Sequence, residues 1–236
     1  MRTPVLPSLA ASVLLACSLA CPAAEVTLTG WAFGRGSTVQ ATGPALPGGS
    51  YNGWAGGFGG RLDDAGSFNT TSFLTYCIEL EESFGFGATA MSGYTIVEGA
   101  RYFKARRALA PSRPDGELVT ERLGQLMTWM NADPGRVDSA EESTAMQLAL
   151  WNAVYDTDWS LGGTGSFGDL SSHQPMATAM LAGARTVSNR YDVFVLTRSG
   201  RQDFLLGALR VPEPGSLALA GLALAALPLL RRRRAG

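Results

Sequence analysis

The spacing of hydrophobic positions changes its period along the chain. Apolar and polar residues alternate over 25–33, and segments 68–80 and 94–97 are rich in β-branched and aromatic residues, which predicts three strands. Segments 35–66 and 84–93 are rich in glycine, which predicts loops and short strands. Apolar residues then recur at helical spacing from Val119 to Met130, and Pro134–Gly135 end that predicted helix.

A second helix is predicted to begin at a capping box, because Ser139 is followed three residues later by Glu142. It is expected to run to about Asp156, and Pro175 can open a third helix. Segments 191–198 and 203–211 read as two strands joined by a turn, a candidate hairpin. The order of strands, helices and strands predicts an α+β fold, an antiparallel β-rich sandwich or barrel with an inserted helical subdomain.

The first 24 residues have the three regions of a secretory signal peptide. Arg2 is the only charge, an apolar segment covers 9–20, and small residues precede a possible cleavage after Ala23 or Ala24. Residues 14–17 loosely resemble a lipobox ending at Cys17, so lipoprotein processing is the alternative to signal peptidase I. We expect an apolar signal helix over 1–24 and a mature domain over 25–210.

Residues 211–236 combine a proline motif, an apolar segment and a basic end. Leu217–Leu230 would form a helix of about 21 Å, shorter than a hydrocarbon core of about 30 Å. The shortness predicts a transient stop of this transmembrane helix in the inner membrane, and a permanent single-pass anchor is the alternative. The residues concerned are Val211, Pro212, Glu213 and Pro214 in the motif, and Arg231, Arg232, Arg233 and Arg234 at the end.

These three parts, in this order, resemble the PEP-CTERM sorting signal. The resemblance implies export and sorting by exosortase, a membrane cysteine protease that cuts near Pro-Glu-Pro. Members of that family are exported proteins of Gram-negative bacteria, often associated with exopolysaccharide and biofilm matrix. The resemblance therefore implies signal peptidase and exosortase as processing partners. It also implies an inner-membrane intermediate and a final place at the cell surface or in the extracellular matrix.

The charge and the cysteine content of the mature domain differ from those of the whole chain. The 236 residues carry a net charge of −1, whereas residues 25–210 keep 14 basic and 19 acidic side chains, a net of −5. This balance argues against nucleic acid as a partner. Cys77 is the one cysteine of the mature domain. In an oxidising compartment, an unpaired cysteine suggests intermolecular pairing or a thiol with a chemical function.

Gln147 lies beside the apolar stripe of the predicted 139–156 helix. It precedes Leu150 and Trp151 by three and four positions, so it projects next to that stripe. An amide near an apolar face needs hydrogen-bond partners or a covalent purpose. On helix geometry alone, the alternative is a glutamine at the edge of the stripe, solvated or bonded to backbone.

The residues around Cys77 and Gln147 resemble the two signature segments of Cys-Gln thioester domains of bacterial surface adhesins. The segments are 75–79 (TYCIE) and 145–151 (AMQLALW), with Met146 where the family often has threonine, and 52–58 (NGWAGGF) is similar to a segment upstream of the cysteine. The resemblance implies that the Cys77 thiolate attacks the Gln147 amide, expels ammonia and leaves a thioester. Tyr76 and Trp151 are candidates for shielding it from water.

Such a thioester would acylate amines or hydroxyls of a target surface once, without turnover, so an adhesive protein rather than an enzyme is expected. No cofactor or metal is implied. The alternatives are a non-covalent exopolysaccharide-binding or matrix-binding protein, which could use Trp31, Trp54, Trp129 or Trp159, and a cysteine hydrolase using Cys77 with His173. The acidic residues near Cys77 would raise a thiol pKa, which disfavours the hydrolase. Solvated loops are expected for Asp63, Asp64, Glu79, Glu81 and Glu82, and a solvated helix face for Lys104.

Overall fold

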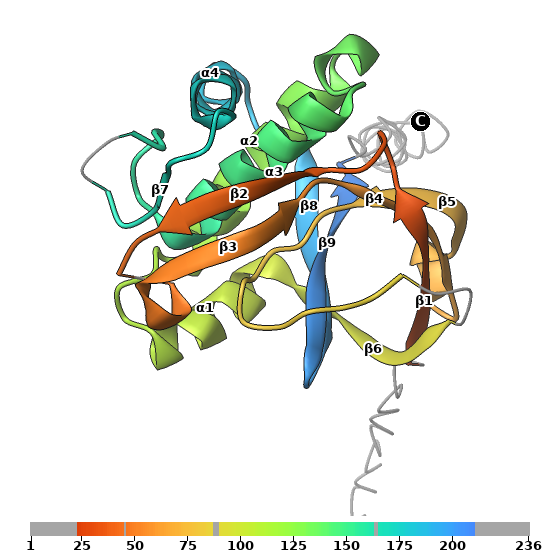
Figure 1. Ribbon diagram of the computed structural model, residues 1–236. Helices are drawn as coiled ribbons and strands as arrows, with labels where there is room; N and C mark the ends of the chain where they lie inside the picture. The colour runs from red at the N-terminus through yellow and green to blue at the C-terminus, as the bar shows by residue number, and fades with distance from the viewer. Residues whose placement is uncertain (1–22, 45, 87–89, 163–164, 211–236) are drawn as a thin grey trace, which may run out of the picture.

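A computed structural model describes residues 23–44, 46–86, 90–162 and 165–210. Its larger sheet has six antiparallel strands in the order β5-β4-β1-β6-β8-β9 (Figure 1). The strands are β1 (Ala24–Trp31), β4 (Phe58–Asp63), β5 (Thr70–Thr75), β6 (Met91–Glu98), β8 (Tyr191–Arg198) and β9 (Arg201–Leu209). Alternation along β1 buries Val26 and Leu28 in the core.

The two outer strands of this sheet meet through the residues that follow β5. Cys77 forms an antiparallel bridge with Phe204 of β9. The Leu205 N–H donates to the Tyr76 carbonyl at 2.9 Å, and the Ile78 N–H donates to the Asp203 carbonyl at 3.2 Å. These bonds turn the sheet into a nearly closed antiparallel barrel, which leaves few unpaired edge groups.

A smaller antiparallel sheet lies beside the barrel, with strands in the order β3-β2-β7 (Figure 1). It comprises β2 (Ser37–Thr42), β3 (Ser50–Ala55) and the two-residue β7 (Gly168–Asp169). Both β2 and β3 contact helix α3, so this sheet covers one side of that helix. Single turns of 3-10 helix cover Pro47–Gly49, Gly66–Phe68 and Pro134–Arg136.

Four helices are inserted between β6 and β8. They are α1 (Gly99–Leu109), α2 (Gly116–Asn131), α3 (Ala140–Tyr155) and α4 (Gln174–Ala184). Every residue of α3 from Ser143 to Tyr155 is buried, because the helix is surrounded by α2, α4 and the small sheet. A helix enclosed in this way can carry functional side chains into the interior.

The structure confirms the α+β class and resolves the choice between sandwich and barrel in favour of a barrel. The capping box at Ser139 and Glu142 is present, and the strand pair 191–198 and 201–209 forms the expected hairpin. Within the described residues, no helix is long and apolar enough to span a membrane. The predicted signal helix, apart from its last two residues, and the predicted C-terminal transmembrane helix lie outside those residues.

Candidate functional site

Cys77 lies two residues beyond the end of β5, at the seam that closes the barrel. Its backbone forms the bridge to Phe204 on one side. The side chain is 7% exposed and makes no disulfide, since Cys77 is a free cysteine in the described part of the chain. The pairing with β9 fixes the direction of the Cys77 side chain, because adjacent residues of an extended segment point to opposite faces.

Gln147 approaches Cys77 from α3 and pairs with its backbone. The Cys77 N–H donates to Gln147 Oε1 at 3.1 Å, and Gln147 Nε2 donates to the Cys77 carbonyl at 2.7 Å. Gln147 has no exposed surface, so both polar ends of its amide are satisfied away from water. The structure therefore brings the two residues predicted from sequence into direct contact. It excludes a solvated glutamine, and the amide is bonded to backbone, as the alternative allowed.

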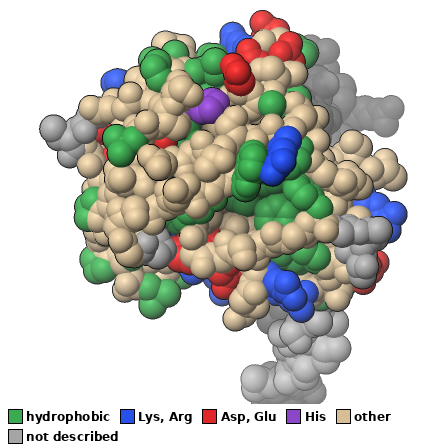
Figure 2. Space-filling view, viewed as in Figure 1, with side chains coloured by type: hydrophobic (Ala, Val, Ile, Leu, Met, Phe, Trp, Pro, Cys, Tyr) green, Lys and Arg blue, Asp and Glu red, His purple; other side chains and the backbone are tan. Residues whose placement is uncertain are grey.

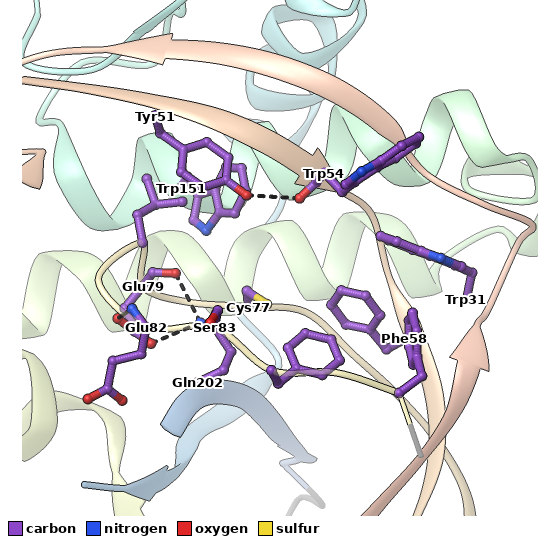
Figure 3. A pocket seen from close by; sticks show the side chains of 13 residues that line it. Trp31, Tyr51, Trp54, Phe58, Cys77, Glu79, Glu82, Ser83, Trp151 and Gln202 are labelled. Carbon is purple, nitrogen blue, oxygen red and sulfur yellow. Dashed lines mark hydrogen bonds between the residues drawn. The ribbon is translucent and has the colours of Figure 1, made fainter. Parts of the chain in front are cut away.

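A pocket of about 320 Å³ opens above Cys77. Its wall is aromatic, and Trp54 and Phe86 at its rim are 44% and 43% exposed. Figure 2 shows hydrophobic side chains gathered in a hollow on this face, and Figure 3 shows Cys77 among the labelled lining residues. The lining residues are Trp31, Tyr51, Trp54, Phe58, Cys77, Glu79, Leu80, Glu82, Ser83, Phe84, Phe86, Trp151 and Gln202.

The two proposed shielding residues lie on different sides of the Cys77 segment. Trp151 is one turn beyond Gln147 on α3, and its ring lines the pocket, edge-to-face with Tyr51 at 5.2 Å between centroids. Tyr76 instead points to the opposite face, where it lines a separate small cavity with Met127 and Met146. Trp151 thus lines the same pocket as Cys77, whereas the Tyr76 ring packs behind the segment.

Two hydroxyls near the start of α3 form hydrogen bonds to the backbone of residues 37, 55 and 57, beside the pocket. Neither hydroxyl was among the residues predicted from the sequence. Ser143 Oγ accepts from the Gly57 N–H at 2.7 Å. Thr144 Oγ1 accepts from the Ser37 N–H at 3.0 Å and donates to the Ala55 carbonyl at 3.1 Å. The one sequence signal for these bonds was a serine and a threonine near the start of a predicted helix. Their partners lie 86 to 107 residues away in sequence, so the partners could not be predicted.

Glu79 holds the chain that leaves Cys77. It is 1% exposed, and its two carboxylate oxygens accept four N–H groups at 2.9–3.2 Å. The donors are the Glu81, Glu82 and Asp203 backbones and the Gln202 side chain. The carboxylate therefore ties the segment after Cys77 to β9, where the sequence predicted a solvated loop.

The acidic residues and burial set the protonation of this site. Burial first, and the charge of Glu79 second, raise the pKa of the Cys77 thiol well above its ordinary value. Burial and a hydrogen bond with Glu81 raise the pKa of Glu79 to about 8. The backbone N–H donors lower this pKa, but by less. Burial would also raise the pKa of Glu81, but Glu79, Arg113 and Arg106 outweigh it and lower that pKa to about 2. Burial, the larger cause, therefore keeps Cys77 a thiol at neutral pH, whereas the sequence pointed only to the acidic residues nearby.

The other candidate residues lie in several parts of the structure. His173 is the N-cap residue of α4, with Nδ1 3.5 Å from Ser171 Oγ. Lys104 is exposed on α1, as predicted, and Asp63 forms an exposed ion pair with Arg61. Of the four tryptophans considered for stacking on sugars, Trp31 and Trp54 line the pocket. An arginine stacks over each of Trp54, Trp129 and Trp159.

Comparison with known proteins gives two findings. Residues 210–234 match the PEP-CTERM protein-sorting motif, so the chain carries the signal of an exported protein sorted by exosortase to the cell surface. Among solved structures, the fold is similar to the N-terminal thioester domain of a surface protein from Clostridium perfringens, determined as a cysteine-to-alanine mutant. The TM-score is 0.46 at 15% identity, over 72% of this chain and 99% of that chain. No curated protein sequence matches the chain.

Proposed function

We propose that this exported protein forms a thioester between Cys77 Sγ and Gln147 Cδ and uses it to attach covalently to a surface. The observation that carries the proposal is the reciprocal pair of hydrogen bonds between the Gln147 amide and the Cys77 backbone. These bonds hold the amide against the segment that bears the thiol, and Cys77 itself lines an open pocket. Preorganised contact of this kind lowers the entropic part of a reaction barrier.

Formation of the thioester releases one molecule of ammonia. Cys77 Sγ bonds to Gln147 Cδ, the Cδ–Nε2 bond breaks, and the thiol proton leaves with Nε2 as ammonia. The Cys77 N–H already donates to Gln147 Oε1, so it faces the oxygen on which negative charge develops during the attack. Because burial keeps Cys77 protonated at neutral pH, we expect formation to be slow and single-use rather than rapid and catalytic.

The same features favour storage of the bond once it is formed. The high pKa of Cys77 makes its thiolate a poor leaving group, which slows attack by water. Trp151 and Tyr51 cover the base of the pocket. We infer that the protein delivers its acyl group at the surface or in the extracellular matrix of a Gram-negative bacterium, after exosortase has acted on its C-terminal signal.

The state of the Cys77 thiol tests this proposal. In the freshly purified full chain, we expect the Cys77 peptide to resist alkylation by iodoacetamide in denaturant. Treatment with methylamine should then release the thiol and leave a methylamide on Gln147. The Gln147→Ala variant should show an alkylatable Cys77 without methylamine. Full alkylation of native Cys77 before methylamine treatment contradicts the proposal.

A non-covalent matrix-binding protein is the second candidate. The exposed fractions of Trp54 and Phe86 at the pocket rim favour it, because aromatic faces open to solvent can stack on sugar rings. The two functions differ in their dependence on the thiol. Attachment to cell-surface glycans that is unchanged in the Cys77→Ala variant would favour the non-covalent function.

A further inference from the structure

Trp151 brings an unused hydrogen-bond donor into the pocket. The side chain is 2% exposed, and its Nε1–H has no hydrogen-bond partner among the described residues. Figure 3 shows the indole behind Tyr51 with its nitrogen edge turned toward the Glu79 and Cys77 side of the pocket. A buried N–H without a partner costs free energy, so this group marks a position where a ligand atom can accept a hydrogen bond.

Several of the polar atoms around this donor are already engaged. Both oxygens of Glu79 accept N–H groups, and Glu82 Oε1 accepts the Gly200 N–H at 3.0 Å. The Tyr51 hydroxyl donates to the Trp54 carbonyl at 3.0 Å. Among the buried side-chain polar atoms of the described lining residues, Trp151 Nε1 alone lacks a partner. The pocket therefore offers its ligand one buried donor that no protein group uses.

From this arrangement we propose that the group acylated by the thioester is a carbohydrate hydroxyl, held by Trp151 Nε1–H. This inference rests on the function proposed above. A hydroxyl oxygen has two lone pairs, so one can accept from the indole while the other attacks Gln147 Cδ. A neutral amine has a single lone pair, which cannot do both. The indole can therefore hold an alcohol oxygen in position while that oxygen attacks, which it cannot do for an amine nitrogen.

The step balances without another reactant. The hydroxyl oxygen bonds to Gln147 Cδ, the Cδ–Sγ bond breaks, and the hydroxyl proton passes to Cys77 Sγ. The products are an ester on Gln147 and a free Cys77 thiol. The raised pKa of Cys77 means that its thiolate has a high affinity for protons in this buried position, so it is a suitable acceptor for the hydroxyl proton.

The walls of the pocket suit a sugar ring. Trp31 and Trp54 lie at 6.5 Å between ring centroids, on the side of the pocket open to solvent. Aromatic faces pack against the apolar C–H faces of sugars, and the volume of about 320 Å³ is that of a small-ligand site. Arg35 stacks over Trp54 at 3.9 Å and adds donors at the rim, which also suit hydroxyl oxygens.

A matched pair of probes tests the inference on the full chain. Methyl glucoside supplies hydroxyls, and its 6-amino-6-deoxy analogue replaces one hydroxyl by an amine on the same ring. Covalent adducts on the Gln147 peptide are followed by mass spectrometry in the native chain and in Trp151→Phe, which keeps an aromatic ring and removes the donor. Loss of one hydrogen bond should lower the ratio of ester to amide formation about ten-fold. Trp129→Phe, outside the pocket, should leave the ratio unchanged.

The outcomes separate this inference from the function on which it rests. An ester with methyl glucoside, and a ratio that falls in Trp151→Phe alone, support the hydroxyl target. An amide with the amino probe but no ester, or an unchanged ratio in Trp151→Phe, overturns it while leaving the thioester intact. Absence of any adduct, together with an alkylatable Cys77, overturns the thioester itself.

Discussion

Replacement of Gln147 by glutamate is expected to lower the free energy of unfolding by about 3 kcal/mol and to abolish covalent attachment. One carboxylate oxygen can still accept the Cys77 N–H, but the other would face the Cys77 carbonyl, to which Nε2 now donates at 2.7 Å. A charge would also enter a position with no exposed surface. The free energy of unfolding should be compared with that of Cys77→Ala. That variant also lacks the thioester, but it retains both hydrogen bonds between Gln147 and the backbone of residue 77.

Gln174→Glu provides the matched control for this change. Gln174 is partly exposed at the first position of α4, where a negative charge is favourable. The substitution removes only the hydrogen bond from Gln174 Nε2 to the Leu161 carbonyl, at 3.2 Å. Its effect in urea denaturation should be below about 1 kcal/mol. Equal destabilisation by the two substitutions would show that the Gln147 amide is not the buried, doubly bonded group described above.

Replacement of Gly57 by alanine is expected to destabilise the protein by about 2 kcal/mol and to slow thioester formation. A Cβ at this position would lie 2.8 Å from Tyr76 Cζ and 3.0 Å from Leu74 Cδ1, closer than the ordinary contact distance of a side chain. Relief requires a shift of Tyr76 or of the Gly57 backbone, which donates to Ser143 at 2.7 Å. Either shift moves Cys77 or α3, and so disturbs the contact with Gln147.

Gly59→Ala is the control for the same chemical change in the neighbouring strand β4. A Cβ there would meet only Thr29 Oγ1, at 3.7 Å, which is an ordinary contact. We expect a change in stability below about 0.5 kcal/mol and a normal rate of thioester formation. Thermal unfolding and alkylation of Cys77 measure the two effects. If Gly57→Ala behaves like Gly59→Ala, the close packing against Tyr76 does not position Cys77.

Local signals in the sequence predicted the elements well. The Ser139 and Glu142 capping box, the helical period from Val119 and the alternation of β1 depend on neighbouring residues, and each formed as expected. The pairing of Cys77 with Gln147 could be proposed because a resemblance linked two short segments. Neither composition nor period shows that residues 70 apart in sequence will meet.

Other features depend on long-range packing and could not be predicted. The barrel closes because Cys77 pairs with Phe204, which a single strand pattern does not encode. The same pairing decides that Tyr76 faces away from the pocket that Trp151 lines. Glu79 was predicted to be solvated because two of its four N–H donors, from Gln202 and Asp203, reach it only in the folded chain.

The mass of the purified full chain tests the central claim most directly. If Cys77 and Gln147 form a thioester, the native protein should be lighter than its composition requires by one ammonia, about 17 Da. The Cys77→Ala variant should have the full mass of its own composition, and the deficit should map to the peptides that contain Cys77 and Gln147. A native protein at its full composition mass, freshly purified and never exposed to amines, would contradict the account.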